Sequence, residues 1–193
     1  PERLVDRSLP WPERGRGERV STSSRNRNVI GKKDEMELVS VKVLVIGGVA
    51  AGTKAAAKLK REDRGLDVAL ITKDQDISYA GCGLPYYVGG MIESRDELIV
   101  NTPEKYAALT GVRVLTGREA VELDSGKKLV TAKNLITGET EAYSYDRLVI
   151  ATGASSAVPP IEGVGLKGVF KMRTPDDAIR IRDYVEAEKV KKA

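Results

Sequence analysis

The sequence is poor in the side chains that metal and haem sites use. It contains no histidine and a single cysteine, which excludes an internal disulfide and leaves a zinc or haem site almost without ligands. Aromatic residues make up 5% of the chain, too few for a surface that stacks nucleic-acid bases. No apolar run approaches the length of a membrane span, and no signal-peptide pattern opens the chain. We therefore predict no metal, nucleic acid or membrane as partners, and a reducing, cytoplasmic setting.

The basic excess of the chain does not change this expectation. The net charge is +4, and many basic residues lie within residues 1–40, where acidic residues are interleaved with them. The same segment is rich in Arg, Ser, Glu, Pro and Gly and lacks apolar periodicity, so it cannot bury enough surface to offset its ordering entropy. We predict that residues 1–40 form a disordered extension, with Met36 as a candidate start of the natural protein.

A strand, a helix and a second strand follow in close succession from residue 41. Residues 41–46 form a β-branched run that ends in two glycines, the pattern of a buried parallel strand. Residues 50–61 have helical composition, and residues 68–72 form a second short apolar run. This spacing predicts a right-handed βαβ unit with parallel strands.

The remainder of the sequence extends this unit into a larger domain. Further strands are expected at residues 112–115 and 147–151, and two Thr-Pro pairs mark the starts of helices. Residues 117–145 alternate apolar and polar with turn signals, which predicts a three-stranded antiparallel excursion. The predicted fold over residues 41–193 is a Rossmann-like α/β domain, a parallel sheet with helices on both faces plus this excursion.

The turn after the first strand has the pattern of a dinucleotide-binding loop. Gly47 permits the tight turn, and Gly52 allows the helix to pack close to the strand. The middle glycine of the usual pattern is Val49 here, but Gly48 beside it can let the backbone approach a pyrophosphate at the helix N-terminus. The alternative is a βαβ turn that binds no nucleotide.

The acid that usually binds the ribose of a dinucleotide is absent at the expected spacing. About twenty residues beyond the last glycine the chain carries Thr72 instead of an acid. Asp74 or the Thr72 hydroxyl must take that role if the turn binds a dinucleotide.

The single cysteine, Cys82, lies between two glycines just after the second strand and before a short helical run. A thiol at the start of a helix gains thiolate character, and flanking glycines leave the sulfur open to a planar ring and to a substrate. A lone cysteine cannot form an internal disulfide, so a redox role needs an exogenous thiol, a persulfide or oxygen. The alternative is a buried structural cysteine.

Three stretches, residues 45–52, 78–90 and 145–153, match motifs of a known family and occur in the same order as in that family. With them, residues 41–193 resemble the FAD-dependent pyridine nucleotide-disulfide oxidoreductases, in the branch of coenzyme A-disulfide reductases and NADH oxidases. The resemblance implies that Cys82 is the redox nucleophile over the flavin, cycling between a thiolate and a mixed disulfide with coenzyme A or a sulfenic acid.

The resemblance also implies binding residues for both ligands. The residues implied to bind FAD are Gly47, Gly48, Ala51, Gly52, Thr72, Lys73, Val121, Ala151, Thr152 and Gly153, with Ala120 beside Val121 at the adenine. Those implied to bind coenzyme A are Lys54, Lys58, Arg61 and Ser78, of which the basic three share a helical face. That face could equally be a solvated basic surface. An asparagine that often precedes the family's cysteine is Gly81 here.

In the family the chain continues into an NAD(P)H-binding unit and a dimerisation domain. The resemblance therefore implies a longer, homodimeric parent enzyme that uses NAD(P)H to reduce a small disulfide of the coenzyme A type, a persulfide or oxygen. We expect residues 1–193 alone not to turn over NAD(P)H. The alternative is a module that binds FAD or a nucleotide without catalysis.

Overall fold

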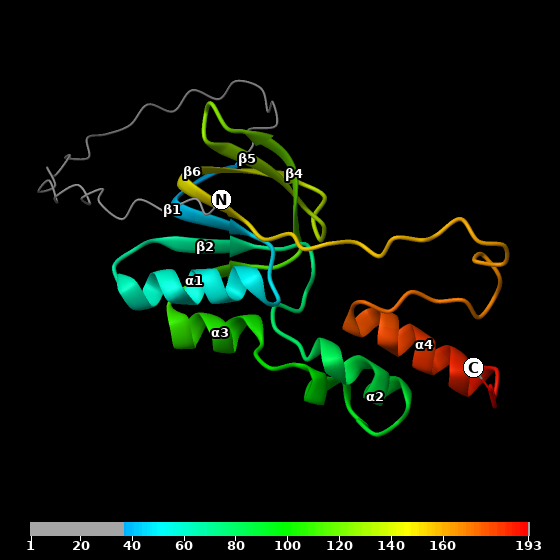
Figure 1. Ribbon diagram of the computed structural model, residues 1–193. Coiled ribbons are helices and arrows are strands. Elements are labelled where there is room, and N and C mark those ends of the chain that lie inside the picture. Colours follow the sequence, from blue (N-terminus) through cyan, green and yellow to red (C-terminus); the bar gives the residue numbers. More distant parts are fainter. Residues whose placement is uncertain (1–36, 193) are drawn as a thin grey trace, which may run out of the picture. The chain divides into compact units, whose positions relative to one another are not determined.

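The computed structural model describes residues 37–192 of the chain (Figure 1). The predictions made for residues 1–36 lie outside this range. In chain order the helices and strands are β1 (Glu37–Ile46), α1 (Ala51–Glu62), β2 (Val68–Ile71), α2 (Leu84–Val88), α3 (Pro103–Thr110), β3 (Arg113–Leu115), β4 (Arg118–Asp124), β5 (Leu129–Asn134), β6 (Thr140–Ile150) and α4 (Pro175–Ala187). Two short 3-10 turns, η1 (Gly81–Gly83) and η2 (Arg95–Leu98), flank the region of α2.

One mixed sheet contains all six of these strands, in the order β3-β2-β1-β6-β5-β4. Strands β1, β2 and β3 pair in parallel, and β6 pairs in parallel with the other side of β1. Strand β5 is antiparallel to both β6 and β4. The predicted βαβ unit and antiparallel excursion are thus confirmed. Strand β1 begins at Glu37 instead of residue 41, because β6 continues alongside it and pairs Glu37 with Glu141.

Strand β6 differs from the sequence-based expectation, which placed the end of the excursion and a separate strand at residues 147–151. These two pieces are one continuous strand, Thr140–Ile150 (Figure 1). Its first half pairs with β5 as well as with β1, and its second half pairs with β1. The sheet therefore passes without interruption from its parallel part into the antiparallel arm β4-β5-β6.

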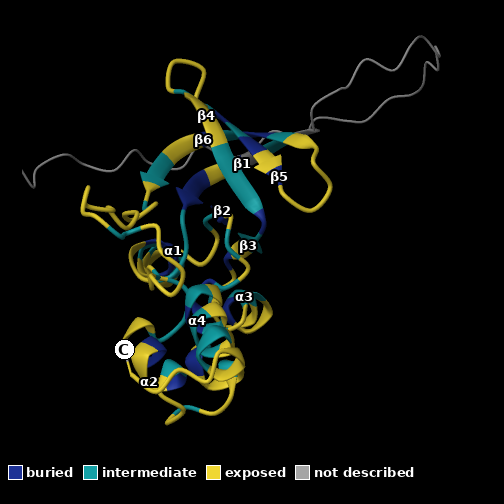
Figure 2. Ribbon diagram, turned by 90° about the vertical axis from the view of Figure 1, so that its right-hand side faces the viewer, coloured by how far each residue is buried: buried dark blue, intermediate teal, exposed yellow. Residues whose placement is uncertain are grey.

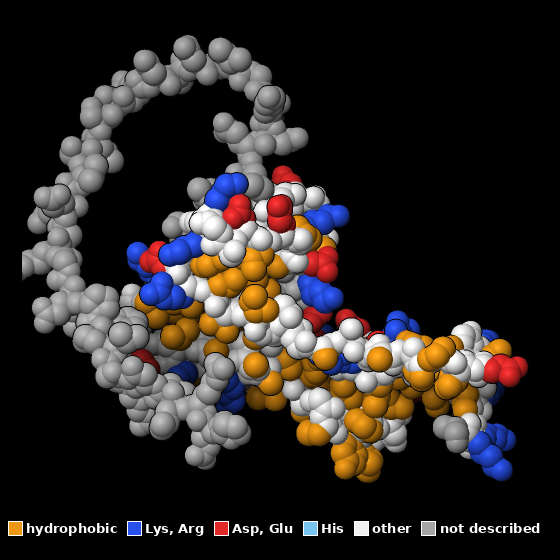
Figure 3. Space-filling model, turned by 45° about the horizontal axis from the view of Figure 1, so that its top comes forward, with side chains coloured by type: hydrophobic (Ala, Val, Ile, Leu, Met, Phe, Trp, Pro, Cys, Tyr) orange, Lys and Arg blue, Asp and Glu red, His pale blue; other side chains and the backbone are white. Residues whose placement is uncertain are grey.

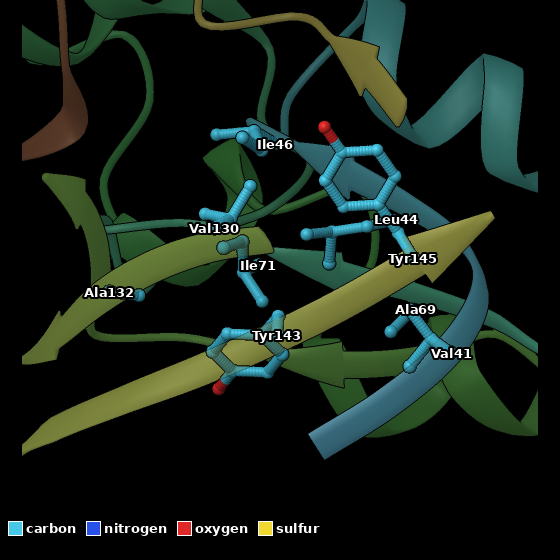
Figure 4. Packing of buried hydrophobic residues seen from close by; sticks show 9 residues of the cluster. All are labelled: Val41, Leu44, Ile46, Ala69, Ile71, Val130, Ala132, Tyr143 and Tyr145. Atoms are coloured by element: carbon cyan, nitrogen blue, oxygen red, sulfur yellow. The ribbon is translucent and has the colours of Figure 1, made fainter. Parts of the chain in front are cut away.

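The two faces of the parallel strands are covered in different ways. On one face, α1 and α3 pack through Ala56 and Tyr106 against a cluster that includes Val45 and Leu70. On the other face, Leu44 and Ile71 pack against side chains of the arm, and Tyr143 lies fully buried among them (Figure 4). We expected helices on both faces; within residues 37–192 the arm, curled over the sheet, covers the second face instead.

Helices α2 and α4 pack on each other, although they are far apart in the sequence (Figure 2). Their contact is an apolar cluster in which Leu84 and Tyr87 of α2 meet Ala178 of α4. Thr174 is the N-cap of α4, and its hydroxyl accepts a hydrogen bond from the Asp177 N–H in a capping box. This confirms the helix start that the Thr-Pro pair predicted.

The segment between β6 and α4 has no regular secondary structure and exposes several large apolar side chains. Apolar side chains are visible along it in Figure 3. Its exposed large apolar residues are Val158, Ile161, Leu166, Val169 and Met172. The segment is nevertheless anchored to α4, since the rings of Phe170 and Tyr184 meet edge-on at 5.0 Å between centroids. Among the helices of residues 37–192, none has the length and apolar character that a membrane crossing requires.

Candidate functional site

A cavity of about 460 Å³ opens where strands β1, β2 and β6 reach their carboxyl ends. Strand β1 is the point at which the strand order reverses, since the chain proceeds from it towards β2 and β3 and returns on its other side as β6. Ligands of open α/β sheets bind at such a position. The residues lining the cavity are Ile46, Gly47, Gly48, Val49, Ala50, Ala51, Thr72, Lys73, Asp74, Tyr79, Arg118, Glu119, Ala120, Ala151, Thr152, Gly153, Arg173 and Thr174.

Two glycines allow the backbone segments around the cavity to approach closely. Gly47 has φ +103°, and a Cβ there would overlap the carbonyl group of Ala151 at the end of β6. A Cβ on Gly52 would overlap the carbonyl oxygen of Gly47 and lie 3.3 Å from a methyl carbon of Val45. Larger residues would therefore separate β1 from β6 at the first position and α1 from β1 at the second.

Val49 occupies the position of the missing middle glycine and adopts a conformation that glycine favours. Its φ is +68°, in the left-handed region where a β-branched residue is strained. Two hydrogen bonds hold it there: the Val49 N–H donates to the Ile77 carbonyl at 2.6 Å, and the Thr53 hydroxyl donates to the Val49 carbonyl at 2.6 Å. The turn thus keeps the glycine-type geometry although the sequence pattern is broken.

Replacing Val49 with glycine is expected to raise the free energy of unfolding by roughly 1 kcal/mol. Relief of the left-handed conformation contributes about 1–2 kcal/mol, and the greater flexibility of glycine in the unfolded chain removes about 0.5–1 kcal/mol. Chemical denaturation of the two proteins measures the difference. Lys128→Gly is the control for the effect of glycine at a left-handed position. Lys128 also has a positive φ of 53°, but it lies in the turn between β4 and β5, away from the cavity. A loss of stability in Val49→Gly would show that the valine side chain contributes more by packing than it costs in strain.

The N-terminal end of α1 faces the cavity with its amide groups uncapped. Ala50 is the N-cap and provides no side-chain hydrogen bond, and the first turn of α1 contains no acidic residue. The first N–H groups of a helix lack partners within the helix and lie at the positive end of its dipole. Because Ala50 and Ala51 line the cavity, this end of α1 is suited to hold a phosphate group.

Polar side chains from β2 and β4 form the next part of the wall. Thr72 is buried at the end of β2, and Lys73 and Asp74 follow it. Lys73 lies 4.0 Å from a carboxylate oxygen of Glu119 on β4, a contact between two partly exposed groups. The sequence count left Asp74 or Thr72 to replace the missing acid; both line the cavity, together with Glu119.

Several cavity residues were not found by sequence reasoning, and Arg118, Arg173 and Thr174 are among them. Arg118 lies at the start of β4, and Arg173 and Thr174 precede α4, more than a hundred residues beyond the glycine turn in the printed sequence. The Arg173 guanidinium covers Gly153, where an added Cβ would come within 2.9 Å of it. The Tyr79 hydroxyl donates to the Arg173 carbonyl at 3.3 Å, which joins the two segments. No local pattern in the sequence signals these long-range contacts.

A largely buried polar network fixes Arg118 at the cavity. Its guanidinium lies 3.4 Å from the Glu141 carboxylate and donates to the Thr116 carbonyl at 2.8 Å. Asn134 donates to the same carboxylate at 3.0 Å, and the Tyr143 hydroxyl also donates to it. Burial raises the pKa of Glu141, but these hydrogen bonds outweigh it and hold the pKa below its usual range. Glu141 therefore stays ionised and ties the three strands of the arm together.

The residues predicted to bind FAD lie in the cavity wall, with two exceptions. Gly52 lies behind the turn, buried where α1 packs against β1. Val121 is 57% exposed and does not line the cavity, whereas its neighbour Ala120 does. Val121 lies where the regular pairing of β4 with β5 is interrupted, since the register shifts between Ala120 and Glu122.

Cys82 lies outside the cavity wall, exposed in the turn η1 directly before α2. The alternative of a buried structural cysteine is therefore wrong. Tyr79, three positions earlier in the sequence, lines the cavity and connects this segment to it. The Gly83 N–H donates to the Ala80 carbonyl at 2.8 Å and closes the turn around the cysteine.

Of the four residues predicted to bind coenzyme A, only Arg61 lines one of the two hollows described for residues 37–192. Lys54 and Lys58 are exposed on α1, and Lys58 forms an ion pair with Glu62. Arg61 lines a second hollow, between α1 and α3, in which Lys60 and Arg64 are the other charged residues. Ser78 is half-buried near Cys82, and its carbonyl accepts a hydrogen bond from the Val100 N–H at 2.9 Å. Within residues 37–192, no group of three or more Asp, Glu, Cys or His side chains is arranged to hold a metal ion.

Comparison with known proteins agrees with this arrangement. Residues 41–191 match the family model of pyridine nucleotide-disulphide oxidoreductases. The chain belongs to this family. The matched range begins within β1 and includes the glycine turn, the Cys82 segment, the arm and α4, so every part of the candidate site lies within the region shared with other pyridine nucleotide-disulphide oxidoreductases.

Individual members of the family show the same extent of similarity. An NADH oxidase of Methanocaldococcus jannaschii is 36% identical over 152 residues, which cover 79% of this chain and 34% of that protein. An NAD(P)H coenzyme A polysulfide/persulfide reductase of Pyrococcus horikoshii is 40% identical over 154 residues, covering 80% and 34%. The crystal structure of reduced Bacillus anthracis CoADR-RHD superimposes with a TM-score of 0.74 at 36% identity, covering 79% and 28%. The chain thus spans about a third of the length of the curated relatives that it matches.

Proposed function

We propose that this chain is the FAD-binding part of an NAD(P)H-dependent oxidoreductase that reduces a small disulfide, a persulfide or oxygen through Cys82. The observation that carries the proposal is the position of Tyr79, which connects the cavity to the cysteine segment. A cavity bordered by a helix end suited to a phosphate lies at the reversal point of the sheet, and the exposed Cys82 lies three residues beyond Tyr79 of its wall. The names of the relatives support the same reaction class.

Several features of the cavity support FAD as its ligand. The uncapped end of α1 with Gly47 and Gly48 would hold the diphosphate, and Thr72, Lys73 and Asp74 would bind the adenosine ribose. Ala120 would border the adenine, and residues 151–153 would border the flavin end. The glycines support this fit, since a Cβ at Gly47 would overlap the Ala151 carbonyl and push β1 and β6 apart. When bound, FAD would accept two electrons from a nicotinamide and make them available to the cysteine.

Cys82 would act as the nucleophile towards the substrate. Its thiolate displaces one sulfur of a disulfide, so that a Cys82–substrate disulfide forms as the substrate S–S bond breaks and one thiolate leaves. Two electrons and one proton then release the second substrate half as a thiol and restore the Cys82 thiolate. Exposure of the sulfur suits this reaction, because the incoming disulfide must reach it in line.

The basic face of α1 would select substrates that carry phosphate groups. Lys54, Lys58 and Arg61 supply positive charge, and Ser78 lies near the cysteine turn, which fits a disulfide of the coenzyme A type. Gly81 has open space where a Cβ would point, so this chain has room for a bulkier substrate group beside the sulfur. We further propose that the complete enzyme is a cytoplasmic homodimer.

The purified chain is expected to take up FAD and to keep it through gel filtration. The measurement is the visible absorbance of the protein fraction, with FMN added to a parallel sample as the ligand control. FMN lacks the adenosine and the diphosphate that α1 and Thr72 would hold, so it should elute separately. A colourless protein that takes up neither ligand would contradict FAD binding by this chain. Bound FAD that, once reduced, transfers no electrons to a disulfide would favour the non-catalytic binding module.

A further inference from the structure

The segment that carries Cys82 is held from two sides. One side is η2, since the Ala80 N–H donates to the Leu98 carbonyl at 2.8 Å. The other side is α4, which packs its Ala178 against Leu84 and Tyr87 of α2. Helix α2 has one and a half turns and is too short to be stable without such packing. The position of the cysteine turn therefore depends on what α4 contacts.

Arg182 of α4 makes the polar part of this contact. Its Nη1 donates to the carbonyl oxygens of Tyr87 at 3.4 Å, Ile92 at 3.2 Å and Glu93 at 3.1 Å. Its guanidinium also lies over the Tyr87 ring, 4.8 Å from the centroid, and its Nε donates to Glu186 at 3.0 Å. The side chain is only 23% exposed. Arg182 thus gathers the carbonyl groups at the end of α2 and in the loop that follows it.

A direct packing contact leads from this loop to the cysteine. The Ile92 side chain lies against Gly83, where an added Cβ would meet its Cδ1 at 3.3 Å. Gly83 is buried and immediately follows Cys82. Because Arg182 holds the backbone of Ile92, it also fixes the Ile92 side chain, which packs against Gly83 of the cysteine turn.

The other end of α4 reaches the cavity. Arg173 and Thr174, which precede the helix, line the cavity wall, and the Arg173 carbonyl accepts the Tyr79 hydroxyl. Helix α4 therefore contacts the cavity through its N-terminal end and the Cys82 segment through Ala178 and Arg182. A rigid helix in this position fixes the distance between the two.

We propose that Arg182 is a positioning residue, which holds the Cys82 turn at its working distance from the FAD cavity. It does not line the cavity, and its hydrogen bond to the Ile92 carbonyl connects it to Cys82 through the contact of Ile92 with Gly83. The physical basis of this proposal is the set of contacts that Arg182 makes. Its consequence for electron transfer to Cys82 rests on the function proposed above.

The test is residue-resolved amide hydrogen exchange on the chain and on Arg182→Met, which keeps the aliphatic stem and removes the donors. We expect the Met91 and Ile92 amides, which bond to the Tyr86 carbonyl, and the Gly83 amide to exchange about tenfold faster or more. Amides of the central strand β1 should not change. Glu186→Gln is the matched control, because it removes only the ion pair of Arg182 and should leave all these rates unchanged. Arg182→Lys, with one donor group, should fall between the two.

Two exchange results would overturn the proposal: an unchanged Gly83 rate beside faster Met91 and Ile92 rates, or equal acceleration throughout β1. The first would make Arg182 a local cap, and the second a general stabiliser. With FAD bound, Arg182→Met should also lose much of the long-wavelength absorbance of a thiolate beside the flavin, with FAD affinity unchanged within about twofold. An unchanged band would likewise overturn it. Failure of the unmodified chain to bind FAD would instead count against the proposed function, and the Gly83 exchange rate would still decide the role of Arg182.

Discussion

Gly52→Ala is expected to abolish the retention of FAD and to lower the free energy of unfolding by about 3 kcal/mol or more. The new Cβ would overlap the carbonyl oxygen of Gly47. Because this oxygen is a backbone atom, the rotation of a side chain cannot relieve the overlap. Helix α1 would have to shift away from β1, which would carry its uncapped amides out of the cavity. Chemical denaturation and the visible absorbance after gel filtration with FAD measure the two effects.

Gly165→Ala is the control for this substitution. Gly165 lies in the segment between β6 and α4, its φ is not positive, and an added Cβ meets no atom within 4 Å. Its stability and FAD retention should therefore match those of the unmodified chain within about 0.5 kcal/mol. Wild-type behaviour of Gly52→Ala would mean that α1 does not pack on the glycine turn as described.

Cys82→Ser is expected to abolish electron transfer to a disulfide while leaving FAD bound. A serine hydroxyl of similar size cannot form the intermediate disulfide, so the rate should fall by at least about a thousandfold. FAD retention should persist, because Cys82 does not line the cavity and its side chain is exposed. Photochemical reduction of the bound flavin under anaerobic conditions replaces the nicotinamide, and addition of coenzyme A disulfide or glutathione disulfide then starts the reaction. Recovery of the oxidised flavin absorbance gives its rate.

Oxygen provides the internal control for that experiment. A reduced flavin can react with oxygen directly, so admission of air should restore the oxidised absorbance in both proteins. Equal rates with a disulfide in Cys82→Ser and the unmodified chain would remove Cys82 from the reaction. Faster reaction with coenzyme A disulfide than with glutathione disulfide would support the role proposed for Lys54, Lys58 and Arg61.

The parts of the fold that sequence reasoning predicted are those with local causes. The apolar run before Gly47 and the small residues after it specify a strand, a turn and a helix within some twenty residues. The Thr-Pro pairs specify the starts of α3 and α4, because a hydroxyl cap and an N1 proline act within one turn. Val49 shows the limit of such patterns. The backbone conformation is retained without the glycine, because Ile77 and Thr53 hold it by hydrogen bonds.

The features that sequence reasoning did not find depend on contacts between distant segments. Arg173 reaches the cavity only because α4 packs back onto α2, and no periodicity encodes that packing. The continuity of β6 was missed because its two halves have different partners and hence different patterns of polar residues. The placement of Arg61 in a separate hollow depends on α3, whose position relative to α1 is set by the buried Tyr106.

The pairing of β1 with β6 determines when the site can form during synthesis. Strand β1 pairs with β6, which lies far downstream of it in the sequence, so the β1–α1–β2 unit emerges from the ribosome long before β6 completes the sheet. Until then one edge of β1 is unpaired, and the cavity lacks the wall formed by Ala151, Thr152 and Gly153. Contacts of such long sequence separation also slow folding. A nascent chain therefore cannot complete the cavity early, and the exposed Cys82 is synthesised before the cavity wall is closed.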